Sequence, residues 1–181
     1  MIPRLLLASA VCAIVTAVAT GQGQAPVELK VKAGDMAPDF SLPGTDGKIH
    51  KLSDYKGHTV VLAWFPKAFT GGLTAECRSL RASGEIIEKY DVAYFMVSVD
   101  KPEDNKAFAE QEQADFPMLS NPEQDVAKAY GVVPPTCGLA KRWMFFIGPD
   151  GKILHVETQG HTADAGTFLA AKLEELGVKK K

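Results

Sequence analysis

Two side chains in this sequence could act as redox-active nucleophiles, the thiols of Cys77 and Cys137. A thiol reacts through its thiolate, which can attack an electrophile, form a disulfide or bind a soft metal ion. The remaining cysteine, Cys12, lies in an apolar N-terminal stretch that we expect to be removed from the mature chain. An exported chain meets an oxidising environment, so a disulfide or a redox role is chemically open to the two thiols that remain.

The sequence carries no recognisable metal-binding pattern. It has no Cys-x-x-Cys pair, and its four histidines are scattered along the chain. We therefore expect no metal site and no cofactor. The net charge of −2 also argues against a nucleic-acid partner, which would require a basic face.

Cys77 lies in a segment where an apolar run gives way to a helical pattern. Residues 65–77 have the sequence FPKAFTGGLTAEC. Pro66 ends the extended part, two glycines favour a tight loop, and Thr74 begins an amphipathic run. A reactive side chain at such a junction would face the unpaired amides of the helix start. The two candidates are Leu73, which has no reactive group, and Cys77 one helical turn later.

The elements around this junction follow an alternating α/β order. Continuous apolar runs predict buried strands over residues 58–65 and 92–100. Turn signals predict hairpins over 37–55 and 142–157. Helical spacing predicts helices over 74–90, 101–115, 121–131 and 164–176. This order predicts a mixed central β-sheet with helices on both faces, in one layered α/β domain.

The N-terminus has the layout of a secretory signal peptide. A basic start, an apolar stretch and small residues occupy residues 1–21. The alternative is an uncleaved anchor helix, although the apolar stretch is slightly shorter than the ~20 residues that a membrane span needs. We expect residues 22–33 to form an arm and 34–178 to form the domain of an exported protein, periplasmic or secreted.

The sequence resembles the peroxiredoxin family, whose members have a thioredoxin-like fold with an N-terminal β-hairpin. The resemblance is specific at residues 66–73, PKAFTGGL, where the family carries Pro-x-x-x-Thr-x-x-Cys. It is closest to the bacterioferritin-comigratory and alkyl-hydroperoxide-reductase types, and it covers nearly all of residues 34–176. Other matching segments are residues 33–57, 97–111 and 116–132, together with Arg142 ahead of the final hairpin.

The resemblance implies a thiol-dependent peroxidase site. Pro66 would shape the loop, Thr70 would polarise a bound peroxide, and Arg142 would supply a fixed positive charge. The alternative for Arg142 is a structural ion pair alone, although its place after the loop favours the pocket role. A cysteine at residue 73 would be activated as a thiolate by the helix amides and the arginine. The implied substrate is hydrogen peroxide or an organic hydroperoxide. The implied reductant is a thioredoxin-like protein or a low-molecular-weight thiol, and homodimers are common in the family.

Three neighbouring residues have ordinary structural interpretations beside the functional ones. We expect Trp64 and Phe65 to be core residues that also wall the substrate pocket. We expect Glu76 to be a capping or salt-bridge group rather than a catalytic acid.

The chain departs from the family at the residue that matters most. Leu73 stands at the nucleophile position, so the family's peroxidatic step cannot occur at this residue as the sequence stands. One hypothesis is that residue 73 is selenocysteine in the native gene, as in some relatives. The alternative is a non-enzymatic member in which Leu73 fills the vacated pocket and the fold serves as a binding or interaction module.

The role of Cys77 stays open for the same reason. Cys77 could replace the nucleophile, although it lies a turn too deep to share the geometry of Thr70 and Arg142. It could instead be a resolving thiol, since some relatives carry one four or five residues after the nucleophile. A disulfide with Cys137 and an inert buried cysteine are the remaining alternatives.

Overall fold

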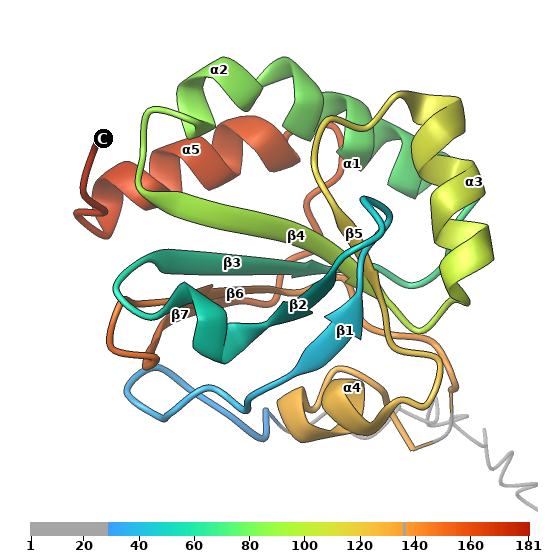
Figure 1. Cartoon of the computed structure of the whole chain (residues 1–181), viewed down its shortest axis with the longest axis horizontal. Coiled ribbons are helices and arrows are strands. Elements are labelled where there is room, and N and C mark those ends of the chain that lie inside the picture. Colours follow the sequence, from blue (N-terminus) through green and yellow to red (C-terminus); the bar gives the residue numbers. More distant parts are fainter. Residues whose placement is uncertain (1–28, 136) are drawn as a thin grey trace, which may run out of the picture.

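The computed structural model describes residues 29–135 and 137–181 of the 181-residue chain (Figure 1). The predicted signal peptide over residues 1–21 lies outside these residues, as does most of the predicted arm over 22–33. Within the described part of the chain, no helix is long and apolar enough to cross a membrane.

Seven strands and five α-helices make up the described domain. The strands are β1 (Ser41–Pro43), β2 (Ile49–Lys51), β3 (Thr59–Trp64), β4 (Val92–Ser98), β5 (Met118–Ser120), β6 (Met144–Ile147) and β7 (Ile153–Glu157). The helices are α1 (Gly71–Ala82), α2 (Gly84–Ile87), α3 (Pro102–Glu112), α4 (Asp125–Tyr130) and α5 (Ala165–Glu175), with a short 3-10 helix η1 at Leu52–Tyr55.

A mixed five-stranded sheet in the order β5-β4-β3-β6-β7 forms the centre of the domain. Strands β3, β4 and β5 are parallel, whereas β6 is antiparallel to β3 and β7 is antiparallel to β6. Strands β1 and β2 form a separate hairpin. The loop that leaves β3 therefore starts in the middle of the sheet, beside the end of β4, where sheets of this type place their binding sites.

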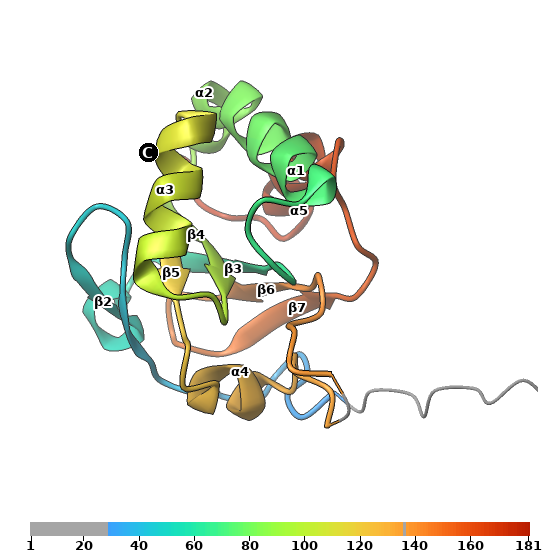
Figure 2. The ribbon, with the colours of Figure 1, turned by 90° about the vertical axis from the view of Figure 1, so that its right-hand side faces the viewer.

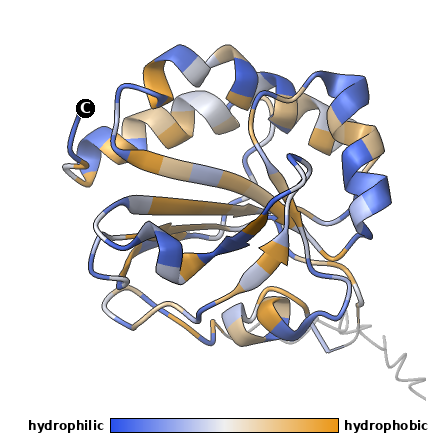
Figure 3. Ribbon diagram, in the orientation of Figure 1, coloured by the Kyte–Doolittle hydropathy of each residue, from blue (hydrophilic) through white to orange (hydrophobic). Residues whose placement is uncertain are grey.

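The side chains of β3 alternate between two hydrophobic clusters. Val61 and Ala63 pack on the face covered by α1, α3 and α5, and Val60 and Leu62 pack on the face covered by the hairpin and α4. The two views of the ribbon show these helices on opposite sides of the sheet (Figures 1 and 2). Hydrophobic residues follow the central strands (Figure 3). Because both faces are covered, β3 is buried at every residue, which explains its continuous apolar sequence.

The structure confirms the predicted mixed sheet, both hairpins and the helices on both faces, and it corrects two elements. The single helix predicted over 74–90 is wrong. The helix is interrupted at Ser83, which separates α1 from α2, and α5 packs close to this residue. Strand β5 was not predicted. Its three residues are too few for a periodic pattern, and it is held by pairing with β4 and by a bridge from Leu119 to Gly44.

A buried polar cluster fixes α3 against two strands. The Nδ2 group of the fully buried Asn105 donates to Ser98 Oγ at 3.0 Å, to the Leu119 carbonyl at 3.3 Å and to Ser120 Oγ at 2.8 Å. Ser98 Oγ also accepts from the backbone N–H of Asp100 at 3.1 Å. The cluster thereby sets the position of Asp100 at the end of β4.

Helices α1 and α5 cross in close contact at Gly166. A Cβ atom at this residue would lie 2.1 Å from the carbonyl oxygen of Ser79, and the Gly166 N–H donates to Ser79 Oγ at 3.0 Å. Only glycine permits this approach of two backbones. Because α1 carries the junction after β3, the crossing helps to fix the site.

Substitution of Gly166 by alanine tests this crossing. Gly166→Ala is expected to lower the free energy of unfolding by about 2 kcal/mol, because the Ser79 backbone can move only if α1 is displaced. Urea unfolding followed by circular dichroism measures the change. Gly71→Ala is the matched control, since a Cβ there has nothing within 4 Å. Wild-type stability of Gly166→Ala would contradict the close crossing.

Candidate active site

The junction between β3 and α1 is closed by a helix cap. Thr70 is the N-cap of α1, and its Oγ1 accepts the N–H of Leu73 at 3.4 Å and donates to the Lys67 carbonyl at 3.1 Å. The predicted helix start at Thr74 is therefore three residues late, because the capping threonine brings both glycines into the first turn. Residue 73 lies in that turn, where the helix amides lack intrahelical partners.

The loop before the cap is fixed to neighbouring elements on both sides. The Ala68 N–H donates to Asp100 Oδ2 at 2.8 Å. Phe69 has a φ of 58°, which is uncommon for a residue with a side chain, and its ring packs edge-on against Phe108 with 5.5 Å between centroids. Such a conformation persists only where surrounding contacts hold it. The contacts of this loop therefore hold Thr70 in its capping position.

Arg142 lies against the first turn of α1 between two glycines. A Cβ atom at Gly72 would meet Arg142 Nη2 at 3.2 Å, and one at Gly160 would meet Arg142 Cδ at 3.4 Å. The Arg142 side chain is 15% exposed, and burial lowers the pKa of its guanidinium below the usual value. The absence of side chains at both glycines leaves room for the arginine beside residue 73.

Arg142 forms a buried ion pair with Glu76. The Glu76 side chain is completely buried, and its two carboxylate oxygens have no hydrogen-bond partner elsewhere in the described part of the chain. A buried carboxylate without a counter-charge is strongly unfavourable, so the pair ties α1 to the segment before β6. The predicted salt-bridge role of Glu76 is confirmed.

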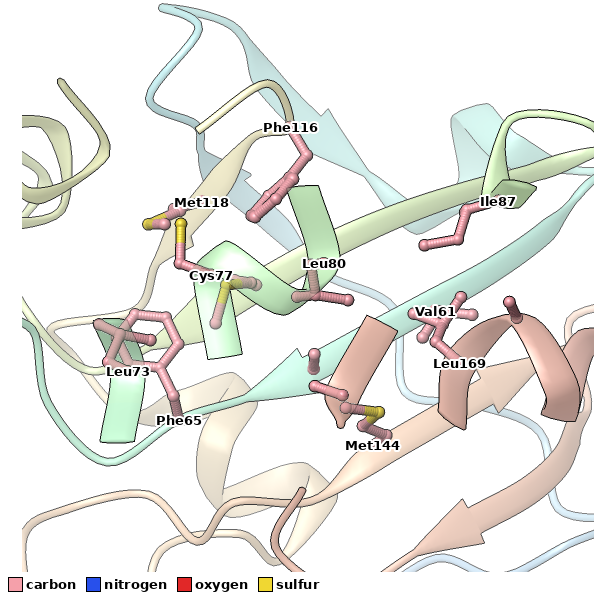
Figure 4. Close-up of a cluster of buried hydrophobic side chains, with 14 of the residues drawn as sticks. Val61, Phe65, Leu73, Cys77, Leu80, Ile87, Phe116, Met118, Met144 and Leu169 are labelled. Atoms are coloured by element: carbon pink, nitrogen blue, oxygen red, sulfur yellow. The ribbon is translucent and has the colours of Figure 1, made fainter. Parts of the chain in front are cut away.

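Leu73 lies in the first turn of α1, beside these groups. Its N–H is held by Thr70, and Arg142 lies against the adjoining glycine. Its side chain is fully buried in the cluster that contains Phe65 and Cys77 (Figure 4). An anion at this position would lie at the positive end of the helix dipole, one residue from the glycine that contacts Arg142. The leucine side chain carries no charge that this environment could stabilise.

Cys77 is a poor nucleophile in this conformation. Its side chain is fully buried on the core side of α1 (Figure 4). Burial, reinforced by the charges of Glu112 and Asp115, raises the pKa of the thiol to about 11, although Arg81 and Arg78 oppose the shift. The thiolate is therefore scarce at neutral pH, and a peroxide cannot reach the sulfur without movement of the chain.

Cys137 is exposed in the segment between α4 and β6. Both Cys77 and Cys137 are free thiols in this structure, so the disulfide considered from the sequence is not formed. One of the two sulfurs is accessible to solvent and the other is not.

The structure places Trp64 and Phe65, both predicted to wall the pocket, on opposite faces of the sheet. Phe65 lies in the same cluster as Leu73, and the half-buried Pro66 begins the active-site loop. Trp64 is a correction: it packs in the opposite cluster, with its ring 6.3 Å from that of Tyr130. Consecutive residues of an extended chain point to opposite faces, so Trp64 cannot line a site on the α1 side.

Sequence reasoning missed two residues around the site: Asp100, which binds the loop at Ala68, and Gly160, which leaves room for Arg142. One signal could have identified Asp100, since the carboxyl ends of adjacent parallel strands meet at the same edge of a sheet. Gly160 follows the last strand without any local pattern.

The two cavities described here do not include the candidate site residues, and the described residues contain no metal-ligating cluster. Two surface cavities of about 380 and 340 Å³ are lined by other residues, and neither includes Thr70, Leu73 or Arg142. Within residues 29–135 and 137–181, no group of His, Cys, Asp and Glu side chains could hold a metal ion.

Comparisons with known proteins agree with this geometry. The profile of the AhpC/TSA family matches residues 33–156. Peroxiredoxin Bcp of Escherichia coli is 39% identical over 132 residues, covering 70% of this chain and 85% of that protein. Peroxiredoxin Bcp of Bacillus subtilis is 32% identical over 147 residues, covering 76% and 94%.

Solved structures give the same result. The crystal structure of peroxidoxin BcpB from Mycobacterium tuberculosis superposes with a TM-score of 0.72 at 32% identity, covering 80% of this chain and 97% of that one. A cysteine-to-serine mutant of PrxQ from Xylella fastidiosa superposes with a TM-score of 0.76 at 22% identity, covering 81% and 98%, which supports the fold alone. The predicted thioredoxin-like fold is confirmed, and the chain belongs to the AhpC/TSA family of peroxiredoxins.

Proposed function

We propose that this protein is a peroxide-reducing oxidoreductase of the peroxiredoxin type, with residue 73 as the position of the reacting sulfur or selenium. One observation carries the proposal: residue 73 lies in the first turn of α1, where Thr70 caps the helix and the buried Arg142 lies against the adjoining Gly72. A helix start with an arginine nearby favours an anion, and a thiolate or selenolate is the anion that attacks peroxides.

The reaction at residue 73 would be a two-electron oxidation of that chalcogen. A thiolate attacks one oxygen of the peroxide, the O–O bond breaks, and the sulfur becomes a sulfenic acid. The departing oxygen leaves as hydroxide or alkoxide and takes up a proton to form water or an alcohol. Arg142 and the helix amides would stabilise the negative charge as it moves between the oxygens.

Cys77 would act in the second step rather than the first. It lies one helical turn from residue 73 and on the same buried side of α1. Its thiol could attack the sulfenic sulfur, forming a disulfide and releasing water, once the helix between them opens. A thioredoxin-like protein or a small thiol would then reduce this disulfide. We also propose that the substrate is hydrogen peroxide or an organic hydroperoxide, and that the protein is exported and forms homodimers.

Leu73 leaves the chain, as its sequence stands, without the nucleophile for the first step. The proposal therefore includes the hypothesis that the native gene encodes selenocysteine or cysteine at residue 73. Reading the native codon tests it, because an ordinary leucine codon would remove the hypothesis.

A second candidate function rests on Leu73 itself. The leucine is completely buried and Cys77 is protonated at neutral pH, so the site has a filled pocket and no thiolate. If the native codon is leucine, this combination favours a binding or interaction module built on a peroxiredoxin fold.

Restoring the nucleophile tests the assignment of residue 73. Leu73→Cys is expected to consume hydrogen peroxide at least about a hundredfold faster than Leu73→Ser, because a sulfur at this position is both activated and correctly placed. Stopped-flow measurements on the reduced protein give the rates. A Leu73→Cys variant no faster than Leu73→Ser would contradict the assignment.

Removing Cys77 from the sequence as it stands tests whether this thiol is the nucleophile. Cys77→Ser and the unchanged chain are expected to consume peroxide at the same rate at pH 7, since the pKa of about 11 leaves about one thiol in ten thousand ionised. The same peroxide assay measures it, with Cys137→Ser as the control for the exposed thiol. Loss of activity in Cys77→Ser alone would show that Cys77 attacks the peroxide.

A further inference from the structure

Glu112, the last residue of α3, makes an unusual number of contacts with α1. Its carboxylate accepts from Arg78 Nε at 2.9 Å, and its side chain is 5% exposed. Its carbonyl oxygen accepts from Arg81 Nη1 at 2.8 Å. Hydrogen bonds from the side chains of Gln111 and Arg78 hold the pKa of the carboxyl below its usual value. We name Glu112 and its two partners on α1, Arg78 and Arg81, the Glu112 latch.

The two partners on α1 lie on one side of the helix. Arg78 and Arg81 are spaced as i and i+3. Cys77 directly precedes Arg78. Unwinding of α1 that carries Cys77 out of the core therefore also displaces Arg78 from residue 112.

The contacts are of the stronger kinds. The bond between the Arg78 guanidinium and the Glu112 carboxylate is charge-assisted, and the carboxylate is largely removed from solvent. The Glu112 carbonyl is one of the α3 C-terminal carbonyls without an intrahelical partner, and Arg81 satisfies it. Opening of α1 would thus remove the guanidinium from the Glu112 carboxylate, which keeps only its bond from Gln111, and would leave the carbonyl at the end of α3 without a partner.

We propose that the Glu112 latch controls access to Cys77 by holding the middle of α1 closed. The fully buried thiol reacts only in the fraction of molecules in which this part of α1 is open, and the latch sets that fraction. The inference concerns any reaction of Cys77 and does not rest on peroxide chemistry. If Cys77 is a resolving thiol, the latch also limits the rate at which it resolves.

The rate of thiol modification measures the opening directly. The full-length chain is treated with N-ethylmaleimide at neutral pH, and peptide mass spectrometry follows Cys77 and the exposed Cys137 separately. Glu112→Ala is expected to accelerate modification of Cys77 at least about tenfold, with Glu112→Gln between it and the unchanged chain. Modification of Cys137 should change less than about twofold, because it needs no opening.

Two matched variants separate the latch from general effects. Glu110→Ala removes an exposed glutamate from the same helix and should leave the Cys77 rate unchanged. Asn105→Ala loosens α3 elsewhere and lowers global stability without touching the latch. The proposal is overturned if Glu112→Ala leaves the Cys77 rate within twofold of the unchanged chain. It is also overturned if Asn105→Ala, at equal loss of stability, accelerates Cys77 as much as Glu112→Ala does.

Discussion

The buried ion pair between Glu76 and Arg142 is the interaction on which the candidate site depends. It joins the second turn of α1 to the segment before β6, and both side chains are largely or completely withdrawn from water. Removing one member of such a pair typically costs about 3–5 kcal/mol, because the other charge is left buried and unpaired. The pair therefore fixes the arginine against α1 whatever residue stands at position 73.

This constraint explains how a site can persist without its nucleophile. The capped helix start, the loop tied to Asp100 and the arginine beside Gly72 are each held by contacts that do not involve the side chain of residue 73. Leucine fits because the same position opens towards an apolar cluster. Residue 73 therefore has polar surroundings on its backbone side, from the helix start and the nearby arginine, and apolar surroundings on its side-chain side, from the core.

The sequence supports much of this account, and its failures have physical causes. Continuous apolar runs identified β3 and β4 because strands covered on both faces need no polar side. The capping role of Thr70 and the full length of α1 depend on one hydrogen bond, donated by the Leu73 amide to the threonine hydroxyl, and apolar periodicity does not reveal such a bond. Strand β5 and the break at Ser83 depend on the partners β4 and α5, which are distant in sequence.

For the site itself, Thr70, residue 73 and Arg142 are predictions from the sequence, whereas the cap of Thr70 on α1 and the contact of Arg142 with Gly72 required the fold. Sequence reasoning misplaced Trp64, since neighbouring residues of a strand face opposite sides of a sheet. The burial of Cys77 was among the alternatives, but the pairing of α1 with Glu112 could not be anticipated from residues so far apart.

The central claim is that the surroundings of residue 73 stabilise an anion. The most direct test is the thiol pKa in a Leu73→Cys variant, obtained from the thiolate absorbance at 240 nm as the difference from the unchanged chain. The account predicts a pKa well below the ordinary value of about 8.5. A pKa at or above that value would contradict it, since the helix amides and Arg142 would then give the position no preference for negative charge.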